Sequence, residues 1–126
     1  MTLHLDICYD REPANLEALA AALRELGATL RGVAEDVPFL LDARTLRNGD
    51  SFTFDTVHGP LDVLATPSGT RGYDDLAPAA RTVNLGGIAV PVVALNDLIR
   101  MKTAAGRPKD RLAVEELLAL RDEAPE

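Results

Sequence analysis

The chain has 126 residues, enough for one hydrophobic core, so we expect a single domain over residues 1–126. Its formal net charge of -7 argues against broad binding to nucleic acid or to anionic membranes, because both require a basic surface. No apolar run resembles a signal peptide or is long enough to cross a bilayer, so we expect a cytoplasmic protein that does not bind membranes. The single cysteine, Cys8, lies in an apolar run and is expected to be a buried small hydrophobe.

The N-terminal part of the chain predicts a strand followed by a helix. Residues 2–8 have the two-residue period of a strand, which places His4 and Asp6 on one face and three aliphatic residues on the other. Pro13 then begins a run of leucines and alanines at helical spacing, and Gly27 ends it. We therefore expect His4 and Asp6 to be neighbours on one face of the sheet.

The middle of the chain predicts a hairpin after a less regular segment. Residues 28–41 suggest a short strand and then irregular chain, and residues 42–46 suggest a helical turn. Residues 51–57 and 61–65 read as two strands joined by a loop that contains Gly and Pro. Asp62 lies in the second of these strands, where Asp is disfavoured, so another group is expected to compensate for it.

The C-terminal part predicts a short helix at residues 74–79, a second hairpin and two helices. The hairpin covers residues 82–92 and turns at Gly86-Gly87. Gly106 can end the first helix in the left-handed conformation, and Pro108 is suited to begin the second. We therefore expect two helices that meet at a corner.

Cations gather at this corner. Lys102 lies on the last turns of the first helix, and Arg107 and Lys109 lie at the junction, near a helix N-terminus that favours anions. One interpretation is that the corner is a phosphate-binding site. The other is structural: Lys102 caps carbonyl groups and Arg107 pairs with Asp110, which fixes the angle between the helices.

Carboxylates form a second candidate cluster, which we expect to face the basic corner. If the strand that holds Asp62 lies beside the first strand, Asp62 joins His4 and Asp6. A divalent cation would relieve the repulsion between the carboxylates, and hard ions such as Mg²⁺ prefer oxygen, although imidazole suits them poorly. The alternative is that His4 and Asp6 form an ordinary pair and Asp62 caps a backbone group.

Six segments in chain order carry a resemblance to a known family. They are Thr2-x-His4-x-Asp6, residues 12–16, residues 42–46, Phe52-Thr53-Phe54, residues 59–64, and Lys102 followed by residues 106–110. In this order, from Thr2 to about Leu120, the chain resembles the minimal nucleotidyltransferase-like domains grouped with abortive-infection toxins of the AbiEii type. The resemblance implies an α+β fold, in which helices pack on a mixed, largely antiparallel sheet.

The resemblance also implies a reaction and its residues. A nucleoside monophosphate is transferred from a nucleoside triphosphate to RNA or protein, with Mg²⁺ or Mn²⁺ held by two aspartates on one strand and a third on its neighbour. Asp6 and Asp62 match two of these catalytic and metal-binding positions. Lys102, Arg107 and Lys109 would contact the triphosphate or the acceptor.

Two departures from the family pattern predict an impaired site. The related domains have a Gly-Ser turn before the aspartate strand, whereas here Met1 directly precedes Thr2. His4 stands where the first aspartate is usual, and it occupies that metal position without a negative charge. The alternative function is therefore a catalytically inactive module for nucleotide binding or assembly. Without its usual neighbour the first strand has a free edge, which is suited to a homodimer; a partner antitoxin is the other partner expected.

Overall fold

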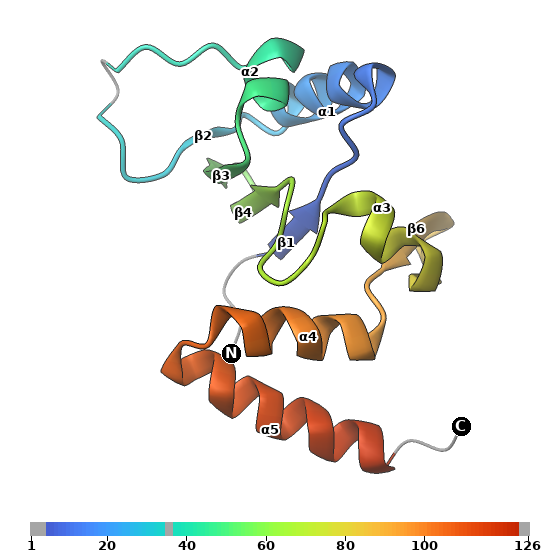
Figure 1. Ribbon diagram of the computed structural model, residues 1–126. Coiled ribbons are helices and arrows are strands. Elements are labelled where there is room, and N and C mark those ends of the chain that lie inside the picture. The colour runs from blue at the N-terminus through green and yellow to red at the C-terminus, as the bar shows by residue number, and fades with distance from the viewer. Residues whose placement is uncertain (1–4, 35–36, 124–126) are drawn as a thin grey trace. The chain divides into compact units, whose positions relative to one another are not determined.

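The structure is a computed structural model that describes residues 5–34 and 37–123, and it has the expected α+β composition with a mixed sheet (Figure 1). Contacts within the chain form two compact units, Met1–Thr66 and Pro67–Glu126. The single domain expected over residues 1–126 stays a prediction. His4 lies outside the described residues.

The first unit contains a four-stranded sheet with the order β1-β4-β3-β2. Its elements are β1 (Leu5–Cys8), α1 (Pro13–Glu25), β2 (Thr29–Leu30), α2 (Ala43–Asn48), β3 (Ser51–Thr56) and β4 (Gly59–Leu64). β1 runs parallel to β4, whereas the β4–β3 and β3–β2 pairs are antiparallel. The prediction of a mixed, largely antiparallel sheet is therefore confirmed for this unit.

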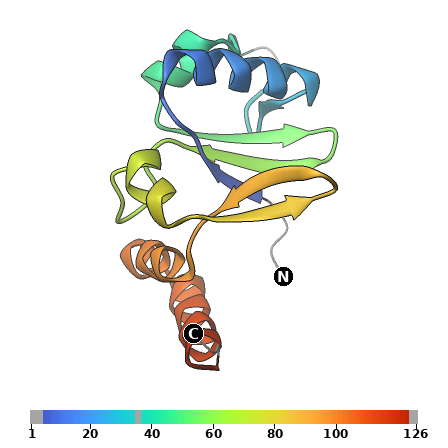
Figure 2. The same cartoon turned by 90° about the vertical axis from the view of Figure 1, so that its right-hand side faces the viewer.

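Both helices of the first unit pack on one face of this sheet (Figure 2). α1 begins at Pro13, as expected, and buries Leu16, Ala20 and Leu23. The core cluster also includes Tyr9, Ala43, Leu46, Phe54, Leu61, Val63 and Ala65. Because neighbouring side chains of a strand point to opposite faces, the residues between the buried ones on β3 and β4 lie on the face away from the helices.

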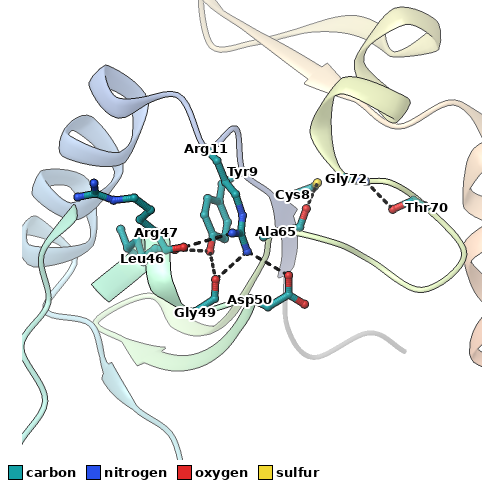
Figure 3. A network of polar contacts seen from close by, with 10 residues as sticks. All are labelled: Cys8, Tyr9, Arg11, Leu46, Arg47, Gly49, Asp50, Ala65, Thr70 and Gly72. Carbon is teal, nitrogen blue, oxygen red and sulfur yellow. Dashed lines mark hydrogen bonds and ion pairs between the residues drawn. The ribbon is translucent and has the colours of Figure 1, made fainter. Parts of the chain in front are cut away.

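The connection from α2 to β3 is held by two side chains from the segment that follows β1 (Figure 3). The Tyr9 hydroxyl donates a hydrogen bond to the Leu46 carbonyl at 2.7 Å. Arg11 donates to the Arg47 carbonyl at 3.2 Å and to the Gly49 carbonyl at 2.8 Å. These bonds satisfy carbonyl groups that the end of α2 leaves without a helical partner.

The first hairpin has a shorter loop than expected. His58-Gly59-Pro60 was predicted to form the loop, but Gly59 and Pro60 belong to β4 and pair with Thr56 and Asp55. The Thr56 hydroxyl closes the turn, since it accepts a hydrogen bond from the His58 N–H at 3.1 Å and donates one to the Gly59 carbonyl at 2.8 Å. Glycine and proline are frequent in loops, which explains the error in the predicted boundary.

The second unit contains the predicted short helix, hairpin and helical corner. Its elements are α3 (Tyr73–Leu76), the 3₁₀ helix η1 (Ala77–Ala79), β5 (Arg81–Leu85), β6 (Ile88–Val92), α4 (Leu95–Ala105) and α5 (Pro108–Glu123). Gly86 and Gly87 form the turn with φ of 60° and 88°. Gly106 ends α4 in the left-handed conformation, with φ of 65°, and its N–H donates to the Lys102 carbonyl.

Among residues 5–34 and 37–123, no helix combines the length and the apolar character that crossing a bilayer requires.

Candidate functional site

Asp6 and Asp62 are direct neighbours on adjacent strands. The parallel β1–β4 pair sets Asp6 opposite Asp62, between the pairs Leu5–Leu61 and Ile7–Val63. Leu61 and Val63 are buried in the core, so Asp62 lies on the opposite face, and Asp6 shares that face because partners in a parallel register point the same way. The structure therefore brings together these two predicted site residues, although 56 positions separate them in the chain.

Arg31 supplies the compensation that the acidic residue in β4 was expected to need. Its guanidinium donates from Nη2 to the Asp62 carboxylate at 3.1 Å and to the Phe54 carbonyl at 2.8 Å. Its Nε donates to the Asp55 carboxylate at 3.3 Å, and its backbone N–H donates to the Thr53 carbonyl at 2.9 Å. Arg31 was not among the predicted site residues, because an arginine after a two-residue strand carries no local signal of a partner 31 positions away.

Asp6, Asp55 and Asp62, together with Arg31, form a group that we call the acidic face. Its three carboxylates and one guanidinium carry two net negative charges. The Asp62 side chain is 17% exposed and the Asp55 side chain 56% exposed, whereas the Arg31 side chain is 33% exposed. Water therefore reaches the carboxylates, and partial burial around Asp62 limits the screening of its charge.

The donor atoms of the acidic face suit a hard divalent cation. Mg²⁺ is commonly bound by one or two carboxylates, with water and substrate phosphates as the other ligands, and Asp6 and Asp62 supply two such carboxylates. Within the part of the chain that the structure describes, no group of three or more His, Cys, Asp or Glu side chains is placed to hold a metal ion. The predicted third ligand, His4, is outside that part.

Asp110 forms ion pairs with two of the three cations predicted at the helical corner, Lys102 and Arg107. Its side chain is 1% exposed and accepts from Arg107 Nε at 2.6 Å and from the Arg107 backbone N–H at 3.2 Å. Lys102 Nζ lies 3.7 Å from the same carboxylate. The side-chain hydrogen bond from Arg107 is the largest cause that lowers the pKa of Asp110. The Arg107–Asp110 pair of the structural interpretation is therefore present.

A hollow of about 310 Å³ lies beside this corner. It is lined by Lys102, Thr103, Gly106, Arg111 and Val114. Lys109 is exposed, and so is Arg111, which the sequence analysis did not single out. Lys102 and Arg111 thus border the hollow with cationic groups that can donate hydrogen bonds to an anionic oxygen, whereas the Thr103 hydroxyl already donates to the Ile99 carbonyl at 2.8 Å.

Cys8 is half-buried, and burial raises the pKa of its thiol. Its Sγ donates a weak hydrogen bond to the Ala65 carbonyl at 3.7 Å (Figure 3). Because the thiolate is the reactive form, a raised pKa makes the thiol a poor nucleophile.

The two predicted sets of site residues belong to different units. Asp6 and Asp62 are in the first, and Lys102, Arg107 and Lys109 are in the second. That they face each other stays a prediction.

Comparisons with models of protein families, with curated proteins and with solved structures found no match to this chain.

Proposed function

We propose that this protein is a nucleotidyltransferase-like protein, which transfers a nucleoside monophosphate from a nucleoside triphosphate to RNA or protein. The observation that carries the proposal is the pairing of Asp6 with Asp62 on the face of the parallel β1–β4 pair that lies away from the helices. Two carboxylates on adjacent strands repel each other and thereby weaken the fold. Arg31 offsets part of this repulsion, and a cation bound by both carboxylates would offset more of it.

In this proposal Asp6 and Asp62 hold one divalent cation, Mg²⁺ or Mn²⁺. When bound, the cation would polarise phosphoryl oxygens and neutralise the charge that develops as pyrophosphate leaves. Lys102 and Lys109 would donate hydrogen bonds to phosphate oxygens of the triphosphate or of the acceptor. Arg107 would also donate to these phosphate oxygens, although its guanidinium is already bound to the carboxylate of Asp110.

The test is transfer of label from each of the four α-³²P-labelled ribonucleoside triphosphates to RNA and protein acceptors, with Mg²⁺ or Mn²⁺. We expect a labelled product with the wild-type protein and loss of it with Asp6→Asn and Asp62→Asn. Asp50→Asn is the matched control, because Asp50 is a surface carboxylate paired with Arg11 at 3.2 Å. The proposal is wrong if no triphosphate labels any acceptor, or if the two site variants are as active as the control.

A second function, a catalytically inactive module for nucleotide binding or assembly, is favoured by the pairing of the charged groups. Arg31 occupies an oxygen of Asp62, and Asp110 engages both Arg107 and Lys102. Such a module would bind nucleotide without turnover. A rise in melting temperature with triphosphate and Mg²⁺, in the absence of any transfer, would support it, whereas no rise would leave only a role in assembly.

The assembly role has a specific surface. β1 is an edge strand of the four-stranded sheet, and no strand of the described residues pairs with its outer edge. Unprotected edges invite strand addition, so we expect a homodimer through β1, or a partner such as an antitoxin at the same edge. Light scattering that shows only a monomer at high concentration would contradict the homodimer.

A further inference from the structure

We propose that Arg31 competes with the divalent cation for Asp62 and so keeps the cation affinity of the acidic face low. This inference rests on the cation site of the proposed function. In the structure Arg31 Nη2 lies 3.1 Å from Asp62 Oδ1, which makes the guanidinium a counter-charge of that carboxylate. A cation held by Asp6 and Asp62 must therefore displace Arg31 from Asp62 or share the carboxylate with it.

The other contacts of Arg31 allow it to release Asp62. Its Nε remains 3.3 Å from Asp55, its Nη2 bonds the Phe54 carbonyl at 2.8 Å, and its backbone bonds the Thr53 carbonyl at 2.9 Å. Three of the four contacts thus do not involve Asp62. After release, Asp55 still neutralises the guanidinium, so the charge of Arg31 is not left without a partner.

The positive charge of Arg31 should lower the affinity of the acidic face for a divalent cation. A guanidinium beside Asp62 cancels much of the field that attracts a cation, and it repels a divalent ion more strongly than a monovalent one. The Asp62 side chain is only 17% exposed, so solvent screens this repulsion less than it would at an open surface. Removal of the positive charge should therefore raise the affinity for a divalent cation, whereas an arginine distant from the face should have no such effect.

The test is a Mn²⁺ titration of the full chain followed by electron paramagnetic resonance of the free ion, without nucleotide. We expect Arg31→Gln to bind Mn²⁺ about three- to tenfold more tightly than the wild-type protein. The matched control is Arg24→Gln, since Arg24 is an exposed arginine on α1 whose Nη1 bonds the Leu41 carbonyl at 2.7 Å. Asp62→Asn should lose the tight binding, also when combined with Arg31→Gln.

Equal affinities of Arg31→Gln and Arg24→Gln would overturn the inference, and so would the absence of Mn²⁺ binding to both proteins. A measurement on the unaltered protein keeps the inference testable if Arg31→Gln does not fold. In nuclear magnetic resonance spectra, the Nη2–Hη2 signal of Arg31, the group that contacts Asp62, should shift as Mg²⁺ is added. An unchanged signal, while the carboxyl carbon of Asp62 responds, would show that Arg31 does not compete.

These measurements separate the inference from the proposed function. No triphosphate is present, so they report on cation binding alone. A protein that binds Mn²⁺ as expected but transfers no nucleotide would contradict the transferase proposal and leave the role of Arg31 intact. A protein that transfers nucleotide but binds Mn²⁺ equally well with and without Arg31 would contradict the role of Arg31 and leave the transferase proposal intact.

Discussion

Repulsion between Asp6 and Asp62 gives a prediction about stability that does not depend on turnover. The two residues are register partners on adjacent strands, which lie about 4.8 Å apart. Two unit charges roughly 5 Å apart repel by about 0.8 kcal/mol in water and by about 3 kcal/mol at an effective dielectric constant of ~20. Asp6 is exposed and Asp62 partly buried, so we expect a repulsion of about 1 kcal/mol, near the lower value.

A double-mutant cycle isolates this energy. Asp6→Asn, Asp62→Asn and the double variant are unfolded in urea and followed by circular dichroism. The cycle cancels the interactions that each residue makes elsewhere, including the bond from Arg31 to Asp62. A coupling of about 1 kcal/mol corresponds to a shift of the urea midpoint by roughly 0.5 M.

Mg²⁺ should reverse the sign of the coupling. Without the ion, each carboxylate contributes less to the free energy of unfolding when the other carboxylate is present. At saturating Mg²⁺ each is more favourable, because an ion held by both stabilises the folded state. A coupling below about 0.3 kcal/mol, the usual error of additivity, with and without Mg²⁺ would refute the argument that Asp6 and Asp62 form one electrostatic unit.

Three further predictions concern contacts that stabilise the fold of each unit. Tyr9→Phe should lower the free energy of unfolding by about 1 kcal/mol in urea denaturation, because the buried Leu46 carbonyl loses its 2.7 Å hydrogen bond; an unchanged midpoint would contradict this. Gly106→Ala should cost roughly 1–2 kcal/mol, because φ of 65° strains any residue with a Cβ, whereas Gly106→Asn should cost less; equal losses would contradict the strain. Bonds from Arg107 lower the pKa of Asp110 in the folded state, so their stabilisation is present above the ordinary carboxyl pKa and lost as pH falls through the lowered one. Acid titration of helicity should show this loss for the wild-type protein, and Asp110→Asn should remove it from the titration curve.

Local backbone preferences allowed much of the secondary structure to be predicted from the sequence. Pro13 began the first helix, Gly86-Gly87 formed the turn of the second hairpin, and Gly106 with Pro108 formed the corner between the last two helices. Each depends on the backbone conformation of a few neighbouring residues, which the residue types themselves restrict. The wrong loop at residues 58–60 shows the limit of such rules, since strand pairing extended β4 into a segment with loop composition.

The acidic face depended on tertiary structure. The sequence placed Asp6 and Asp62 in strands, but only the parallel register of β1 and β4 made them partners. The bond from Arg31 to Asp62 likewise joins groups that lie 31 positions apart, whereas the local Arg107–Asp110 pair was one of the two interpretations that the sequence allowed. The physical reason is that backbone preferences act over a few residues, whereas register and ion pairing follow from how distant hydrophobic faces pack against each other.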